Sequence, residues 1–590
     1  MSNLMGMLTT IQSYVWGPPT LLLLIGTGLY FTIKLRGLQI TKFPRAVRAI
    51  FEKESGTGSG EGDVSAFATL CTTMAADIGT GSIVGVATAL RIGGPGSLFW
   101  MWISAILGMV TKYSESLLAV KYRVTDENNQ MAGGPMFYIQ NGMGERFIWL
   151  AKIFSVFGIC TALFGCGTFP QVNAITESVN VTFHIPIIVA GVIITVLTAV
   201  VTIGGIKSIS KVAEIVVPIM ALTFLGGSVV ALVINRAAVP DAFKTIFTCA
   251  FAKESVIGGT AGTGVITFMT VMRTGIARGV YTNEAGLGSS PIVAAAAKTN
   301  SGVRQGLLSM TSVFVTTILT CSMTGLVIIS SGLMDSSDMN GSTLVTAAYN
   351  MCLPHNIGMY LIAAGIMFFA FTTILGWNYY GERCLVYLTG TTKWIKPYKI
   401  IYITAIALAP FLSLEPIWLL ADITNALMII PNLIAIIALI CAGLLAGVVY
   451  TVTKGKSGTQ KKQEASAEAG ADETESQSGI IEEDGKKYKL NPDIKTVLFM
   501  GVDKEEKADL GNNPGENGQS DSLNLLVLNK EEKTAQIIQI SRDSMVGIDI
   551  YDVTGNRLMT ENGQIALQYA YGDGAEESCR LTSEKVSELM

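Results

Sequence analysis

Charged residues are scarce in this sequence of 590 residues. They make up 15% of it, whereas hydrophobic residues make up 50%. A soluble protein normally carries about a quarter charged residues, so this balance argues against an entirely soluble chain and for a membrane protein. The net charge of −4 provides no basic excess. We therefore expect no nucleic-acid partner.

Histidines and closely paired cysteines are also lacking. The two histidines, His184 and His355, lie between apolar segments. We therefore expect them in loops, and we expect no histidine-based metal site or proton relay at membrane depth. The nine cysteines are scattered and form no C-x-x-C pair. This spacing argues against a thiolate metal cluster and against a disulfide framework.

The few charges are distributed unevenly along the chain. They are sparse over residues 1–453 and crowd together from Lys454 onward. We expect a membrane domain over residues 1–453 and a disordered charged linker over 454–494, which has too little apolar surface to fold. Residues 495–590 regain apolar runs and predict a separate, partial α/β domain.

Residues 1–453 contain long apolar runs typical of transmembrane helices. A spanning helix needs about 20 mostly apolar residues. About eleven runs qualify, which predicts an all-α polytopic membrane protein. They lie near residues 15–34, 65–90, 97–121, 148–170, 186–206, 212–234, 251–272, 306–332, 357–388, 398–413 and 417–452.

Lysine and arginine predict the orientation of these spans, because they favour cytoplasmic loops. Residues 34–53, after the first span, are rich in both. Counting alternate loops places most of the remaining basic residues on that same side. The N-terminus is therefore expected outside, and the tail after Thr453 in the cytoplasm.

The second predicted span has an unusual interior over residues 74–85, with three glycines, Thr80, Ser82 and Asp77. An ionised Asp in the membrane costs several kcal/mol unless it has a partner. A face of small residues for tight helix packing would explain the glycines but not Asp77. We favour a broken helix, whose freed carbonyl and N–H groups bind a cation and a zwitterion.

A second glycine-rich interruption, Gly258–Gly264, falls in the seventh predicted span. Two interrupted spans at matching positions in two halves of a chain indicate a transporter binding site. After the first span, these are numbers one and six of ten, as two inverted repeats of five helices would give. Close helix packing is the alternative.

Two further motifs are candidates for the same site. Thr372 and Thr373 are adjacent hydroxyls in the ninth span, with Trp377 one turn beyond. They could hold a hard cation and wall a pocket, or the threonines could bond their own helix and Trp377 could mark the interface. The run over 278–289 is expected to follow the seventh span as a cytoplasmic gate, with a solvated loop as the alternative. Its candidate residues are Arg278, Asn283 and Glu284.

Several motifs resemble the alanine or glycine:cation symporters, also called sodium:alanine symporters. They are Gly93–Ser104 (GGPGSLFWMWIS), Gly79–Gly81, Ala119–Arg123, Gly133–Met136 and Arg278–Ser289. The resemblance covers about residues 1–453. It implies a leucine-transporter-type fold of 5+5 inverted repeats in a bacterial plasma membrane. It also implies import of a small amino acid with sodium, which serves as coupling ion with no other cofactor.

The resemblance also implies site residues. Those expected to line the substrate are Thr80, Gly81, Ser82, Gly259, Thr260, Gly262 and Trp377. Those expected to hold sodium are Ala76, Asp77, Ile78, Thr372 and Thr373. Asp77 could instead contact the substrate amine or carry a proton, and we favour sodium neutralisation. Relatives commonly have Asn at Ser82 and an aromatic residue at Thr260, so a wider and more polar pocket is expected here.

The tail predicts strands near residues 496–503, 523–529 and 534–540, the last two forming a hairpin. It resembles the opening of a LytR–CpsA–Psr domain, a wall-polymer transferase family. The matching pieces are Val497–Asp503, Ser520–Leu523, Ser541–Ser544 and Ala570–Gly572. We expect a truncated domain without enzymatic activity. The alternative function is a membrane-anchored wall-polymer transferase with the tail as its catalytic fragment.

Overall fold

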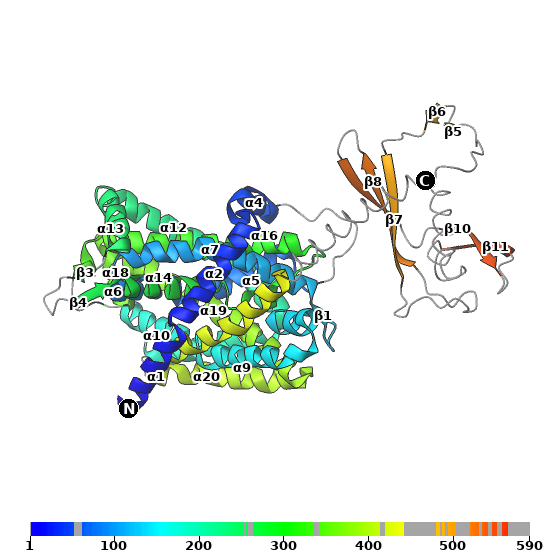
Figure 1. Cartoon of the computed structure of the whole chain (residues 1–590). Helices are drawn as coiled ribbons and strands as arrows, with labels where there is room; N and C mark the ends of the chain where they lie inside the picture. The colour runs from blue at the N-terminus through cyan, green and yellow to red at the C-terminus, as the bar shows by residue number, and fades with distance from the viewer. Residues whose placement is uncertain are drawn as a thin grey trace. The chain divides into compact units, whose positions relative to one another are not determined.

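The computed structural model describes residues 2–51, 62–252, 254–257, 264–335, 339, 341–412 and 419–441, and strands within residues 480–564 (Figure 1). The chain divides into two compact units, Met1–Thr459 and Gln460–Met590. The described part of the first unit is almost entirely helical. That of the second unit consists of strands.

Seven helices among the described residues are long and apolar enough to cross a membrane. They are Met5–Lys34, which contains most of α1 (Ser2–Val15) and all of α2 (Pro18–Lys34); Gly96–Lys121 (α7); Glu145–Phe183, which contains α9 (Ile148–Phe164) and α10 (Phe169–Phe183); Gly205–Ile234 (α12); Gly302–Ser330, which contains α16 (Gly302–Val313), η4 (Phe314–Cys321) and α17 (Ser322–Ser330); Ile357–Thr389 (α19); and Leu419–Cys441. The first unit is therefore a multi-pass membrane domain.

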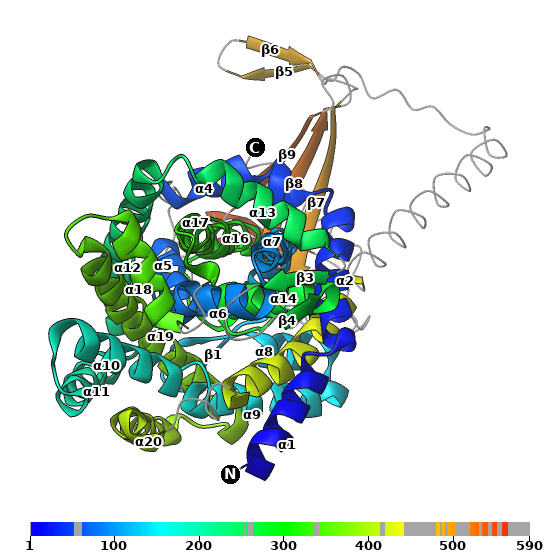
Figure 2. The ribbon, with the colours of Figure 1, turned by 90° about the vertical axis from the view of Figure 1, so that its left-hand side faces the viewer.

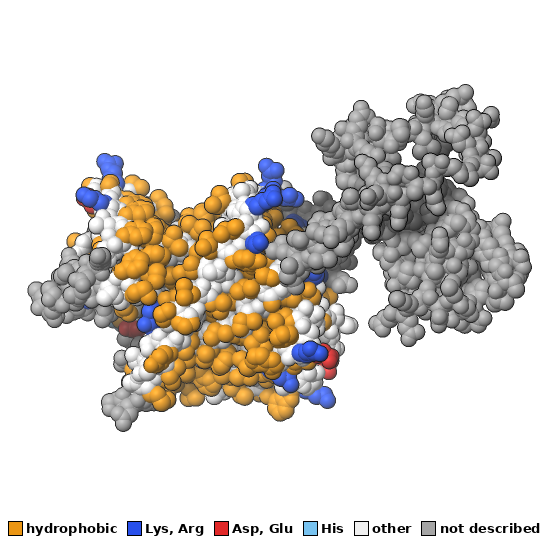
Figure 3. Space-filling view, in the orientation of Figure 1, with side chains coloured by type: hydrophobic (Ala, Val, Ile, Leu, Met, Phe, Trp, Pro, Cys, Tyr) orange, Lys and Arg blue, Asp and Glu red, His pale blue; other side chains and the backbone are white. Residues whose placement is uncertain are grey.

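The surface of this domain is apolar where a soluble protein would be polar. In α11 (Ile187–Ile203), Ile188, Val192 and Val196 recur every four residues and are exposed, whereas Thr198 is buried. Residues four apart share one face of a helix, so this helix presents its apolar side outward, as lipid requires. Figure 3 shows hydrophobic side chains over most of the visible face, with Lys and Arg confined to a few patches.

Shorter elements connect or cover the long helices. They are α3 (Leu38–Thr41), α4 (Phe43–Phe51), the two-stranded β1 (Val124–Thr125) and β2 (Met131–Ala132), α8 (Pro135–Tyr138), η2 (Ile139–Met143), η3 (Glu145–Phe147), α13 (Val239–Phe251), η5 (Leu333–Asp335), α18 (Gly341–Cys352), η6 (Thr392–Trp394), α20 (Ile395–Leu408) and η7 (Ala409–Phe411).

The interruption predicted in the second span is confirmed. Helix α5 (Ala66–Asp77) ends at Asp77, a short η1 (Thr80–Ser82) follows, and α6 (Val84–Gly93) completes the crossing. Glycine is needed here for close approach. A Cβ on Gly79 would lie 2.7 Å from Thr373 Oγ1, and one on Gly81 would lie 2.7 Å from the Tyr281 ring.

The seventh predicted span, 251–272, is wrong. Strands β3 (Glu254–Ile257) and β4 (Gly264–Thr267) form an antiparallel hairpin there, and a helix, α14 (Phe268–Asn283), starts only afterwards. The β-branched residues beside the glycines favour strands over a helix. Residues 258–263, which include Gly259, Thr260 and Gly262, lie outside the described residues.

The second interrupted helix is α14 together with α15 (Ser290–Ala294). Between them, Glu284, Gly286 and Gly288 adopt the left-handed backbone conformation, with φ of 53°, 89° and 81°. This conformation cannot continue a right-handed helix and is readily adopted only by glycine. The solvated loop considered as the alternative for residues 278–289 is wrong for Arg278 and Asn283, because both belong to α14.

Helix α7 lies at the centre of the domain. It packs against α14 and α16 and also contacts α2, α6 and α13. Figure 2 shows α5, α6, α7, α14 and α16 surrounded by the other helices of the unit. Both interruptions therefore lie in the interior of the domain.

In the second unit, β7 (Ile494–Val502), β8 (Ser520–Asn529) and β9 (Thr534–Ile540) form an antiparallel sheet in that order. The predicted hairpin is confirmed, because Asn529 pairs with Thr534. Two further hairpins join β5 (Ile480–Glu483) to β6 (Lys486–Lys489), within the predicted linker, and β10 (Met545–Tyr551) to β11 (Arg557–Gln564). The rest of the linker before β5 lies outside the described residues.

Candidate functional site

A cluster of oxygen atoms lies where α5 ends. The hydroxyl of Thr373, on α19, lies 3.1 Å from the carbonyl oxygen of Ala75, 3.2 Å from that of Ala76 and 3.4 Å from that of Ile78. It also lies 3.0 Å from the carbonyl of Phe369, one turn back on its own helix. A hydroxyl has one hydrogen and cannot satisfy four acceptors. The cluster has the composition of a site for a hard cation.

The neighbouring Thr372 points elsewhere. Its hydroxyl donates to the Phe369 carbonyl at 3.0 Å and lies 3.9 Å from the Met220 sulfur on α12. The contact between α19 and α5 is close, because a Cβ on Gly376 would lie 2.7 Å from the Ala76 Cβ. Of the two threonines predicted as sodium ligands, only Thr373 faces the α5 carbonyls.

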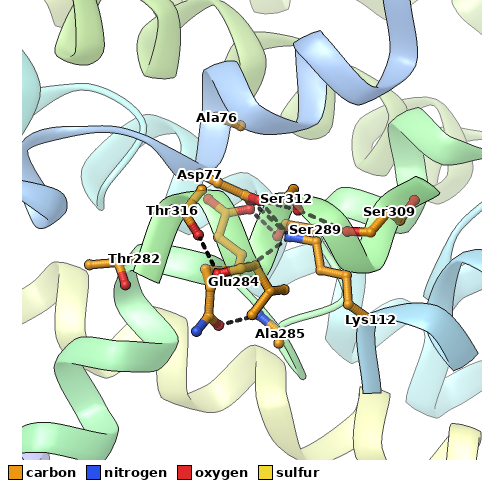
Figure 4. Close-up of polar contacts among 12 residues, drawn as sticks. Ala76, Asp77, Lys112, Thr282, Glu284, Ala285, Ser289, Ser309, Ser312 and Thr316 are labelled. Carbon is orange, nitrogen blue, oxygen red and sulfur yellow. Dashed lines mark hydrogen bonds and ion pairs between the residues drawn. The ribbon is translucent and has the colours of Figure 1, made fainter. Parts of the chain in front are cut away.

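Asp77, the last residue of α5, forms a buried ion pair with Lys112 of α7 (Figure 4). The Lys112 ammonium lies 2.9 and 2.8 Å from the two carboxylate oxygens. It also donates to the backbone carbonyl of Asn283, the last residue of α14, at 2.7 Å. Ser312 of α16 donates to the same carboxylate at 3.0 Å. Lys112 is therefore the partner that an Asp in the membrane requires.

A second buried carboxylate, Glu115, lies one turn along α7. It accepts from the backbone N–H of Gly286 at 3.1 Å and from the side-chain amide of Asn432 at 2.5 Å. Asn432 also donates to the Gly286 carbonyl and accepts from the Tyr138 hydroxyl. The left-handed segment after α14 is therefore held by side chains from α7 and the helix at 419–441.

Glu284 begins this segment and contacts a predicted site residue. The Trp377 indole N–H on α19 donates to one Glu284 oxygen at 2.9 Å, and Ser289 donates to the other. Trp377 is fully buried. The interaction fixes the orientation of the indole, because a buried indole N–H needs an acceptor.

The η1 turn presents unpaired polar groups. The Thr80 backbone N–H donates to the Gln171 side chain of α10 at 3.1 Å, and Ser82 offers its carbonyl to Thr324 at 2.9 Å. The Thr80 hydroxyl is buried and has no hydrogen-bond partner among the described residues. Buried polar atoms are rarely left unpaired, so this hydroxyl is available to a polar ligand.

An ion pair closes one end of this region. Arg278 of α14 pairs with Asp422 at 3.2 Å and lies over the Tyr281 ring, 5.6 Å from its centroid. Gln12 of α1 and Trp16, which follows α1, donate to the same Asp422 at 2.7 and 3.0 Å. The pair borders a cavity of about 390 Å³ beside the end of α6 and the start of α14. Further lining residues include Pro18, Ile92, Met269 and Arg273.

A charged network occupies the opposite end. Arg383 of α19 pairs with Asp126, beside β1, at 2.8 Å and with Glu382 at 2.7 Å. Lys399 of α20 pairs with Glu382 at 3.2 Å. Arg123 donates at 2.9 to 3.0 Å to three backbone carbonyls that follow α15. They belong to Ala295, Ala297 and Thr299.

Backbone hydrogen bonds join the two interrupted helices at this end. The Asp63 N–H, just before α5, donates to the Ala296 carbonyl at 2.8 Å. The Lys298 N–H donates to the Val64 carbonyl at 2.8 Å, and Val64 and Ala297 form a parallel bridge. The start of α5 and the end of α15 are therefore linked directly.

The structure brings most of the predicted site residues together. Those that meet around the two interruptions are Ala76, Asp77, Ile78, Thr80, Gly81, Ser82, Asn283, Glu284, Thr373 and Trp377. Thr372 is turned away, and Arg278 pairs with Asp422 beside the cavity. Gly259, Thr260 and Gly262 lie outside the described residues. The sequence interpretation missed Lys112, Glu115, Gln171 and Asn432. Lys112 and Glu115 carried a usable signal, since both are charged residues inside an apolar span.

This chain is similar to several known proteins. Residues 1–466 match the profile described as "Sodium:alanine symporter family", and residues 449–589 match the LytR_cpsA_psr family. An uncharacterized transporter of Haemophilus influenzae is 51% identical over 432 residues, covering 73% of this chain and 93% of that protein. The "Sodium/alanine symporter AgcS" of Methanococcus maripaludis is 41% identical over 470 residues, covering 79% of this chain and all of that protein. The solved structure of a Na⁺-coupled sialic acid symporter is 13% identical, covers 69% of this chain and 82% of that one, and has a TM-score of 0.42.

Proposed function

The chain belongs to the sodium:alanine symporter family, and we propose that it imports alanine, glycine or a similarly small amino acid together with sodium. The observation that carries this proposal is the oxygen cluster formed by the Thr373 hydroxyl and the α5 carbonyls. A relative named as a sodium/alanine symporter, 41% identical, supports the choice of ion and substrate.

The sodium ion would bind at this cluster. Its ligands would be the Thr373 hydroxyl and the carbonyls of Ala76 and Ile78, joined by that of Ala75. A helix interruption frees such carbonyls, which then replace the hydration shell of a cation. Asp77 would act on this site at a distance, since both of its oxygens are engaged by Lys112.

The amino acid would bind between the two interruptions. Glu284 and Trp377 form one wall in this proposal, and the η1 turn with Thr80 and Ser82 forms the other. The Thr80 hydroxyl, which has no partner among the described residues, would meet one polar end of the substrate. A short side chain suits a site this closely packed, where a Cβ added to Gly81 would lie 2.7 Å from the Tyr281 ring.

Alternating access would open the two ends in turn. The Arg278–Asp422 pair would be the outer gate, and the network around Arg383 the inner one. The two interrupted crossings, α5–α6 and α14–α15, would head two inverted repeats of five helices. In this arrangement the N-terminus lies outside a bacterial plasma membrane and the tail lies inside, as the basic residues favour.

Uptake into proteoliposomes tests the function. Labelled alanine should accumulate with saturating kinetics when an inward sodium gradient is imposed, and should not when potassium replaces sodium. Glycine should compete with it. Sodium-independent, non-saturating flux would contradict the proposal.

The tail supports a second candidate function, because residues 449–589 match a wall-polymer transferase family. In that case the full-length protein would transfer polymer from a lipid-pyrophosphate donor, and Arg542→Ala would abolish the transfer. We favour symport with an inactive tail, for which Arg542→Ala leaves alanine uptake unchanged.

A further inference from the structure

The Lys112 ammonium has as many acceptors as it has hydrogens. Its three partners are the two Asp77 carboxylate oxygens and the Asn283 carbonyl, at 2.7 to 2.9 Å. Neither charged side chain is exposed. Figure 4 shows the lysine reaching from α7 into the space between α5 and α14. All donors of this buried cation are therefore satisfied.

The oxygen atoms around the Lys112 ammonium are those that would bind a free cation. Asp77 is the last residue of α5 and Asn283 the last of α14, so both interrupted helices direct their C-terminal ends at it. The C-terminal end of a helix carries a partial negative charge. Ser312 adds a hydroxyl from α16. The set of a carboxylate, a backbone carbonyl and a hydroxyl is a ligand set for a hard cation.

We infer that Lys112 is a resident cation that occupies this second position permanently, so that the protein carries one sodium ion per amino acid. A tethered ammonium has a very high effective concentration at its site and excludes a mobile ion. The exchangeable sodium is then confined to the Thr373 cluster, whose partners are neutral oxygens. This inference rests on the proposed symport and fixes its stoichiometry.

The geometry separates this role from that of an ordinary structural ion pair. A structural pair needs only Lys112 and Asp77, whereas this ammonium also binds the backbone at the end of the second interrupted helix. It is thus bonded to both interrupted helices, while Thr373 contacts α5 from the other side through the carbonyls next to Asp77.

The wild-type protein provides the first test. An inward sodium gradient is imposed on proteoliposomes, and the initial uptake of sodium-22 and of labelled alanine is measured in parallel. A ratio of one sodium per alanine, with a Hill coefficient of one for sodium, supports the inference. A ratio of two overturns it but leaves sodium symport intact. Uptake without sodium would contradict the proposed function itself.

The substitution Lys112→Ala provides the second test. It leaves the Asp77, Asn283 and Ser312 oxygens without their cation, and a sodium ion should take its place. Equilibrium binding of sodium-22 to the purified protein should rise from one ion per chain to two, and the Hill coefficient for uptake should rise towards two. Binding that stays at one ion would overturn the inference.

Two variants serve as controls. Lys121→Ala removes an exposed lysine from the end of the same helix and should leave the ratio at one. The double variant Asp77→Asn with Lys112→Met removes both charges at similar volume, so it provides no second anionic site and should bind one ion. Two ions bound to this double variant would contradict the role assigned to Asp77.

Discussion

The Thr373→Val substitution tests the sodium site directly. Valine has the shape of threonine but lacks the hydroxyl that lies 3.1 to 3.4 Å from three α5 carbonyls. A polar contact to a charged group contributes about 1.5–3 kcal/mol. Because about 1.4 kcal/mol corresponds to a factor of ten, the sodium concentration for half-maximal alanine uptake should rise about 10- to 150-fold.

The adjacent threonine is the matched control for this experiment. Thr372→Val removes a hydroxyl that bonds its own helix and faces Met220. The sodium concentration for half-maximal alanine uptake should change by less than about threefold, because this hydroxyl bonds its own helix and does not contact the proposed ion site. Thr373→Ser should keep near-normal behaviour. Equal shifts for both valine variants, or none for Thr373→Val, would refute the assignment.

Three further predictions concern the surroundings of the site. Trp377→Phe removes the indole donor and leaves Glu284 without one hydrogen-bond partner, at a cost of about 1–3 kcal/mol. The KM for alanine in sodium-driven uptake should therefore rise about 5-fold or more. An unchanged KM would argue against Trp377 and Glu284 as a wall of the proposed pocket. Gly79→Ala would place a Cβ 2.7 Å from Thr373 Oγ1, whereas the Cβ of Gly85→Ala would lie 4.0 Å from its nearest neighbouring atom. At equal protein level, alanine uptake should fall in Gly79→Ala and not in Gly85→Ala. Equal losses in the two variants would count against the close approach of Gly79 to Thr373. Hydrogen bonds from Thr392 lower the pKa of exposed Glu127 below its usual 4.5, so the carboxylate stabilises the fold above pH 4.5 and this stabilisation disappears as the pH falls through the lower pKa of the folded state. The thermal midpoints of wild type and Glu127→Gln should therefore differ at pH 7 and converge in acid. A difference that stays constant with pH would contradict this prediction.

The first interruption was predictable because an acidic residue and glycines coincide in one apolar run. Helix packing could not explain Asp77, and this could be concluded from the sequence without knowing that Lys112 is its partner. The second interruption was assigned to the wrong place. The run at 258–264 has the same glycine signal, whereas residues 284–289 include Glu284 and look like a solvated loop when their partners are unknown.

The residues that the site residues contact cannot be recognised from the neighbouring sequence. Lys112 is one charge within a strongly apolar helix, and its neighbours in sequence do not reveal that it meets Asp77, 35 residues earlier. Likewise, adjacent Thr372 and Thr373 are equivalent in sequence, and only the packing of α19 on α5 distinguishes them. Hydropathy located most of the long helices in the described residues, although the span expected at 251–272 contains a strand hairpin. The identities of the contacts depend on tertiary packing.

The backbone link between Asp63–Val64 and Ala296–Lys298 has a mechanical consequence. The half-helices α5 and α15 are coupled through the segments next to their ends by backbone hydrogen bonds, which substitutions other than proline leave in place. In the proposed transport cycle, a tilt of one half-helix would therefore be transmitted to the other. Both halves of the domain would then share the displacement, so that closing one path and opening the other would be the same movement.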